Sequence, residues 1–178
     1  SEDFMDTVKF LCLKALKIDN NSVDALVQLT DYYQSTGRNA LALENLQKAI
    51  TISPNSFAAN LAFGKGNPIL YYDPVRSIRC LRKSLKLDPL SVWTPDVYNA
   101  LAFQYLSICD YDKSLLYSNR VLELEQTTIA ASQAYWCLVV SHNRLRNGDK
   151  CIELAEKWNK IDSSQALYHM AEAYCYLK

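Results

Sequence analysis

Three observations predict an all-α solenoid of antiparallel helix pairs, with about nine helices in a single domain over residues 1–178. Apolar residues recur at a spacing of three to four along most of the chain, which is typical of amphipathic helices. Sequence patterns that end helices return at nearly constant intervals. The chain also has only four glycines and five prolines, too few for an all-β fold with many tight turns.

Residues 23–54 show the helix pattern most clearly, as two short helices joined by a turn. Gly37 lies between them, and glycine commonly takes the left-handed conformation just past a helix end. The pair Ser53-Pro54 ends the second helix, because proline lacks an amide proton and restricts the residue before it. The apolar positions are Leu26, Leu29, Tyr32 and Tyr33 on the first helix and Ala42, Leu43, Leu46, Ala49 and Ile50 on the second.

The ends of successive second helices can be aligned along the chain. The segments are LKIDN (16–20), ITISP (50–54), LKLDP (85–89), LELEQ (122–126) and NKIDS (159–163). Their last residues lie 34, 35, 37 and 37 positions apart (54−20, 89−54, 126−89, 163−126). A period near 34 residues with two helices in each unit is characteristic of tetratricopeptide (TPR) repeats.

The chain therefore resembles the TPR family over essentially its whole length, and the resemblance implies a right-handed superhelix whose first helices line a concave groove. Thr30 departs from the family pattern, which has a small residue there. We expect repeats at 22–54, 56–89, 95–126 and 130–163, a second helix of a preceding repeat at 3–20, and the first helix of a further repeat at 165–178. Since these ends fall within repeats, we expect flanking repeats, a terminal partner or self-association. The residues in family positions of the first full repeat are Leu26, Leu29, Tyr33, Ala42, Leu46, Ala49 and Pro54.

The repeat at 56–89 is irregular in its first half. Gly64, Gly66 and Pro68 would destabilise a continuous helix by roughly 5 kcal/mol, taking about 1 for each glycine and about 3 for the proline. We therefore expect this helix to break near 64–68. The second half is regular, because Asp73 can cap a helix and Pro74 suits its first position.

Other helix limits can also be expected from local residue chemistry. The pair Thr94-Pro95 should begin a first helix, and Asp110 should cap the second helix that follows it. In the last full repeat, Gly148-Asp149 should form the turn between the two helices.

Composition excludes several classes of protein. With 19 basic and 19 acidic residues, the chain has no electrostatic footprint for a nucleic-acid backbone. No apolar run reaches the roughly 18–20 residues of a membrane span, and the given residues show no signal-peptide pattern. The six cysteines are scattered, which indicates neither a disulfide framework nor a metal knuckle. Reduced cysteines on apolar helix faces favour the cytoplasm or the nucleus.

The resemblance implies which side chains line the groove. Aromatic anchors with polar neighbours fit an extended or helical peptide, although packing between helices is the alternative role for each aromatic. A Lys/Asn/Arg clamp for the C-terminal carboxylate of a chaperone is not expected, because neither Val27 and Asp31 nor Asn99 and Phe103 are followed by the required cations. The expected partner-binding residues are Asp31, Asn99, Phe103, Trp136, Asn143 and Tyr168.

No residue constellation indicates catalysis, a metal or a cofactor. His142 occupies a tyrosine position on the packed face, so a hydrogen-bonded core histidine is favoured over a general base, which needs a positioned partner. His169 lies six residues before Cys175, a spacing too sparse for a metal site. Trp158 occupies a position that the family usually fills with alanine, and we expect it in the core.

The favoured function is a non-catalytic protein-interaction scaffold that binds a peptide or partner helix, as part of a larger protein or multi-subunit assembly. The alternative is a regulatory or sensory TPR domain of a multidomain signalling or transcription protein. RNA binding by a helical-repeat array of similar period is disfavoured by the balanced charge and by the lack of a paired base-reading code.

Overall fold

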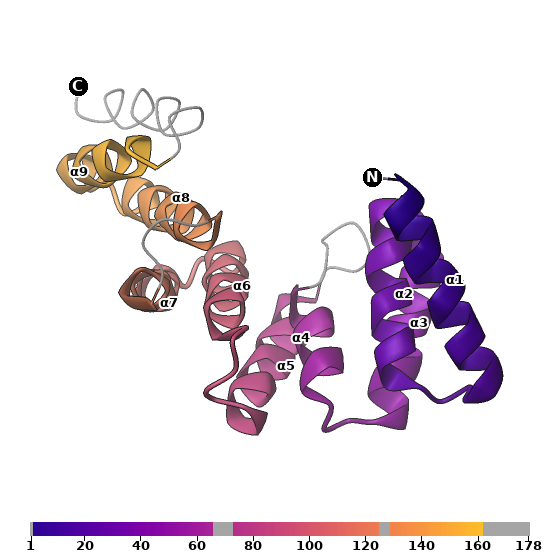
Figure 1. Cartoon of the computed structure of the whole chain (residues 1–178). Coiled ribbons are helices and arrows are strands. Elements are labelled where there is room, and N and C mark those ends of the chain that lie inside the picture. Colours follow the sequence, from indigo (N-terminus) through magenta and orange to yellow (C-terminus); the bar gives the residue numbers. More distant parts are fainter. Residues whose placement is uncertain (1, 66–72, 125–128, 162–178) are drawn as a thin grey trace. The chain divides into compact units, whose positions relative to one another are not determined.

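A computed structural model describes residues 2–65, 73–124 and 129–161, and within these ranges it contains helices and no strands (Figure 1). The expected all-α architecture with about nine helices is confirmed. The helices are α1 (Glu2–Ile18), α2 (Val23–Ser35), α3 (Asn39–Ile52), α4 (Phe57–Lys65), α5 (Pro74–Leu87), α6 (Thr94–Ser107), α7 (Tyr111–Leu124), α8 (Ile129–Arg144) and α9 (Gly148–Asn159).

The chain divides into two compact units, Ser1–Pro89 and Leu90–Lys178. In the first unit α1 packs on α2, α2 pairs with α3, α4 pairs with α5, and α4 also contacts α2 and α3. In the second unit α6 pairs with α7 and α8 with α9, while α8 contacts α6 and α7. Each pair therefore combines a first and a second helix, and within each unit the first helices of the two pairs contact each other, α2 with α4 and α6 with α8. The expected helix at 165–178 lies outside the described residues, and the assignment of the chain to one domain stays a prediction.

Three of the turns inside helix pairs have the same hydrogen-bond pattern. One residue in each turn has a positive φ. The values are 71° at Gly37, 62° at Cys109 and 56° at Arg146. The next amide donates to the carbonyl five residues earlier, at 2.7 Å from Arg38 to Tyr33 and at 2.9 Å in the other two turns. This is the Schellman motif, which satisfies carbonyls at the end of a helix.

The turn before α9 differs from the sequence-based expectation. We expected Gly148-Asp149 to form it, but Gly148 is buried and is the first residue of α9. The left-handed conformation falls on Arg146, and the Asn147 side chain caps α9 by accepting from the Lys150 amide at 3.4 Å. The Asn147 amide donates to the His142 carbonyl at the end of α8, as the Schellman motif requires. This hydrogen bond puts the left-handed residue at Arg146, two positions before the glycine.

The other expected helix limits are confirmed. The Asp73 carboxylate accepts from the Arg76 amide at 2.9 Å, with Pro74 in the first turn of α5. The helix α6 begins at Thr94-Pro95, and Asp110 accepts from the amide of Lys113 at the start of α7 at 3.3 Å. These caps satisfy amides that have no partner within the helix.

Apolar side chains between the helices form the core. In the first unit Leu26 and Ala49 pack in one cluster with Ala59, so that α2, α3 and α4 share it. Full burial of one leucine stabilises the fold by about 1.5–3 kcal/mol. Thr30, which departs from the family pattern, is also fully buried, and its hydroxyl donates to the Leu26 carbonyl at 2.9 Å. A threonine is tolerated there because its one polar group is paired.

Gly64 has a packing role that we did not expect from the sequence. Gly64 lies within α4 and is buried. A Cβ atom at this position would come within 2.3 Å of Leu81 Cγ, on α5. The absence of a side chain thus allows α4 and α5 to approach closely. The rest of the expected break, with Gly66 and Pro68, lies outside the described residues and stays a prediction.

Trp158 anchors the core of the second unit, as expected. Its side chain is fully buried in a cluster with Leu138, Val139 and Leu154. The indole Nε1 donates to the Ser132 hydroxyl at 2.7 Å, so its polar group is also satisfied. This contact joins the second helix α9 to the first helix α8.

Candidate functional site

The best-defined candidate site lies where the first helices α6 and α8 contact each other. Asn99, on α6, is buried, and its side-chain amide donates to the Ala130 carbonyl in the first turn of α8 at 2.9 Å. Its side-chain oxygen is buried without a hydrogen-bond partner. Asn99 therefore positions α8 against α6 from beneath the surface.

Phe103 and Trp136 form an aromatic pair one turn further along α6. Their rings stack, with centroids 5.8 Å apart and an interplanar angle of 24°. Phe103 keeps 38% of its surface exposed, while Trp136 is half-buried and packs against the Trp158 cluster. One ring is thus held rigidly by the core, and the other offers an apolar surface. Such pairs contribute about 0.5–1.5 kcal/mol beyond the area that they bury.

Asn143 lies two turns beyond Trp136 on α8, which places both on one face of the helix. Its side chain is half-buried, and its backbone carbonyl accepts from the Arg146 amide at 2.9 Å. The structure thus brings Asn99, Phe103 and Trp136 together and places Asn143 along the same helix. Tyr168 lies outside the described residues.

Asp31, on α2, belongs to the first unit. The residue is exposed as a whole, but protein atoms crowd its carboxylate, and this loss of hydration raises the pKa of Asp31. The Lys65 ammonium, at the end of α4, opposes the shift and lowers the pKa. Val27, four residues before Asp31 on α2, is buried together with Ala59 between α2 and α4 and offers no surface.

Sequence reasoning missed a tyrosine cluster between α6 and α7. The Tyr117 ring stacks on Tyr105, with centroids 5.6 Å apart, and lies 5.8 Å from Tyr98. The cations of Lys113 and Arg120 lie over Tyr105 and Tyr98 at 5.2 and 5.8 Å. The seven-residue spacing of Tyr98 and Tyr105 on one helix face is the signal that could have indicated it. The cluster holds the helix pair together.

Burial shifts the pKa values of three titratable side chains in the second unit. His142 was expected to be a hydrogen-bonded core histidine, but its buried Nδ1 has no hydrogen-bond partner. Burial lowers the pKa of His142, and Lys150 lowers it further. Burial also raises the pKa of Cys137 to about 12 and that of Cys151 to about 11, so both thiols stay protonated and unreactive at neutral pH.

The described residues hold no group of three or more His, Cys, Asp or Glu side chains arranged to bind a metal ion. None of the described helices is long and apolar enough to cross a membrane.

Comparison with known proteins rests on structure. No protein-family model and no curated protein sequence matches the chain. The crystal structure of MamA superposes with a TM-score of 0.72 at 21% identity, covering 94% of each chain. The structure of YrrB, described as a TPR protein with an unusual peptide-binding site, has a TM-score of 0.71 at 15% identity and covers 93% of this chain and 83% of its own.

A larger assembly also contains this arrangement of helices. The crystal structure of the APC/C hetero-tetramer Cut9-Hcn1 has a TM-score of 0.82 at 15% identity. The match covers 97% of this chain but only 34% of the other. Identities this low show the fold alone. The protein is thus an α-solenoid with the tetratricopeptide-repeat fold, in agreement with the repeat period of its sequence.

Proposed function

We propose that this protein is a non-catalytic scaffold that binds a peptide or partner helix across the first helices α6 and α8. The observation that carries the proposal is the Phe103–Trp136 stack, in which the exposed Phe103 ring lies against the half-buried Trp136 ring that packs on the core. Rigid aromatic anchors of this kind dominate binding energy at protein interfaces, because little conformational freedom is lost on binding.

The surroundings of the aromatic pair suit a peptide. Asn143 lies on the same helix as Trp136 and can donate to or accept from a peptide backbone. The neighbours support the same class of function: YrrB is described as having a peptide-binding site, and Cut9-Hcn1 is described as a hetero-tetramer. We further propose that the protein acts within a larger protein or multi-subunit assembly, in the cytoplasm or the nucleus. Asp31 and Tyr168 remain proposed partner-binding residues.

The test is an affinity pull-down from native lysate with mass spectrometry. The wild type is compared with the Phe103→Ala/Trp136→Ala variant. The matched control is Leu116→Ala/Leu124→Ala, which removes two large apolar side chains, 49% and 56% exposed, from the second helix α7. All three proteins must first melt cooperatively. We expect specific partners to be lost with the α6–α8 variant alone, since removing a central aromatic anchor weakens binding by about thirtyfold.

An unchanged partner list with the α6–α8 variant would overturn the groove assignment. The alternative function, a regulatory or sensory domain beside a signalling or DNA-binding domain, is compatible with the same groove. The sequence of the full-length gene decides it, because the alternative requires such a second domain in the same chain.

A further inference from the structure

The helix α5 carries an unusual concentration of positive charge. Of the chain's 19 Lys and Arg residues, five lie in its 14 residues, and the helix contains no acidic residue. These five are Arg76, Arg79, Arg82, Lys83 and Lys86. Arg76 is placed over the Phe63 ring at 4.3 Å, and the other four line a hollow along the helix together with Val75 and Ile78.

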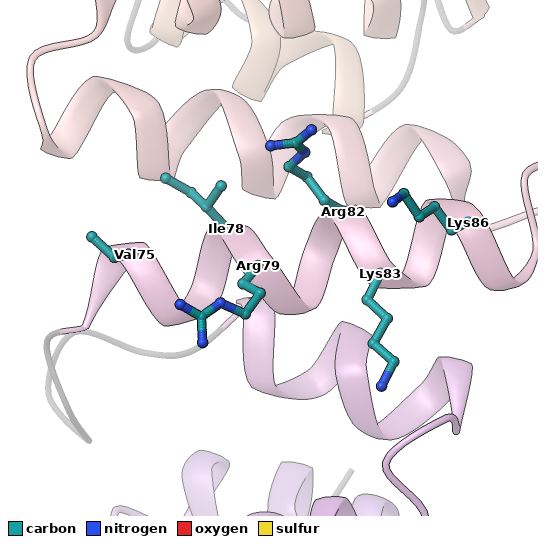
Figure 2. A pocket seen from close by; sticks show the side chains of 6 residues that line it. All are labelled: Val75, Ile78, Arg79, Arg82, Lys83 and Lys86. Atoms are coloured by element: carbon teal, nitrogen blue, oxygen red, sulfur yellow. The ribbon is translucent and has the colours of Figure 1, made fainter.

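Figure 2 shows these six side chains in two rows along one face of α5. One row holds Ile78, Arg82 and Lys86, and the other holds Val75, Arg79 and Lys83. Within each row the residues are four positions apart, so each row runs along the helix with one apolar member followed by two cations.

The four cations of the hollow have no acidic partner in the part of the chain that the structure describes. None of them forms an ion pair with any described residue. Arg79, Arg82 and Lys86 are exposed. Like charges three or four residues apart destabilise a helix, so this arrangement costs stability in the isolated protein.

The helix α9 provides an internal comparison. It is also a second helix with a charged outer face, but its charges are of both signs. Glu153 accepts from both Lys150 and Lys157 at 2.7 Å. This is the ordinary arrangement of a solvated helix face, and α5 departs from it.

We propose that this face of α5 is a second docking surface, and that its occupant is an acidic amphipathic segment of a partner protein. Two rows of cations at four-residue spacing complement carboxylates at the same spacing on a partner helix. Val75, with 61% of its surface exposed, gives the apolar side of such a segment a contact. A phosphate backbone is disfavoured, because the cationic face is confined to one helix of a chain with no net charge.

This surface is independent of the proposed peptide groove. It lies in the first unit, on a second helix, and shares no residue with the site on α6 and α8. The two proposals can therefore fail separately, because the variants that test them change different residues.

The test uses fluorescence polarisation with a short labelled helical peptide of leucine and glutamate. A matched probe replaces every glutamate with glutamine. The variant is Arg79→Glu/Arg82→Glu, and the control is Lys14→Glu/Lys17→Glu, which makes the same change of charge at two exposed lysines of α1. Thermal melting of each variant is measured first. The new glutamates on α5 lie four residues before Lys83 and Lys86, so the melting temperature should not fall.

We expect the acidic probe to bind the wild type and the α1 control equally, and to bind the α5 variant about tenfold more weakly, as the loss of two exposed charge pairs predicts. The glutamine probe should not bind. Equal weakening by both variants, or equal binding of both probes, would overturn the proposal. Tighter binding of oligouridylate or of phosphatidylserine vesicles would also overturn it and assign the face to phosphate. A concentration-dependent dimer that the α5 variant abolishes would instead assign it to a second copy of the chain.

Discussion

Replacing Gly64 with alanine should reveal how closely α4 and α5 approach. A Cβ atom on Gly64 would lie 2.3 Å from Leu81 Cγ, 2.5 Å from its Cδ2 and 3.2 Å from its backbone nitrogen. Leu81 is fully buried, so its side chain has little room to move away. The single added methyl group must therefore displace one helix from the other.

Two opposing contributions determine how much Gly64→Ala changes the free energy of unfolding. Insertion of a methyl group into a packed core destabilises a protein by about 1–3 kcal/mol, and contacts this short place Gly64 near the upper end. Alanine stabilises a helix interior by about 1 kcal/mol relative to glycine. The net result is a loss of about 2 kcal/mol in the free energy of unfolding, which lowers the melting temperature by about 4–8 °C for a chain of this length.

Thermal and urea denaturation of a double-mutant cycle with Leu81→Ala measures this coupling. Leu81→Ala alone should cost about 2–5 kcal/mol. In that background the two shortest contacts, with Leu81 Cγ and Cδ2, are gone, and Gly64→Ala should become neutral or stabilising by up to about 1 kcal/mol. If Gly64→Ala instead stabilises the wild-type protein, the close approach of α4 and α5 is refuted.

Three other substitutions test separate features. Arg146→Gly should stabilise the protein by about 0.5–1 kcal/mol in urea denaturation, because φ is 56° there, while Arg144→Gly within α8 should destabilise it by a similar amount. Burial lowers the pKa of His142 below its ordinary value of 6.5, so as the pH falls the histidine is protonated in the unfolded state before it is protonated in the folded state. The free energy of unfolding therefore decreases as the pH drops below 6.5. His142→Gln should reduce this decrease between pH 7 and 5, as measured by urea denaturation. Trp158→Phe leaves a cavity and removes the hydrogen bond from the indole Nε1 to the Ser132 hydroxyl, and should cost about 2 kcal/mol by calorimetry.

The repeat architecture could be predicted from the sequence because its signals are local and recurrent. Helix periodicity, the caps at Asp73 and Asp110 and the left-handed Gly37 each depend on a few neighbouring residues. Their agreement over several repeats is what made the prediction specific.

The features that sequence reasoning missed depend on contacts between distant residues. Gly64 has the helix propensity of a breaker, but its contact with Leu81, 17 positions later (81−64), gives it a packing role. The turn before α9 falls at Arg146 because the end of α8 sets the hydrogen-bond register, which overrides the local preference for glycine.

The sequence predicted which helix faces line the groove, but not which residues on those faces are exposed. The resemblance placed Val27, Asn99 and Phe103 on the groove-lining faces of first helices, but it does not tell how deeply each side chain is buried. Burial depends on how closely neighbouring first helices pack. In the structure Val27 and Asn99 are buried, whereas Phe103 is exposed. The charged face of α5 is visible in the sequence, but only the absence of ion pairs among the described residues shows that its charge is unbalanced.

Site-specific photo-cross-linking tests the central proposal most directly. A benzophenone amino acid replaces Phe103 on α6 in one protein and Leu116 on α7 in another, and both are irradiated in native lysate. Both side chains are exposed, so the probes have comparable access to solvent. A partner that binds across α6 and α8 should cross-link from position 103 and not from position 116. Cross-linking from position 116 alone, or equally from both, would contradict binding in the groove.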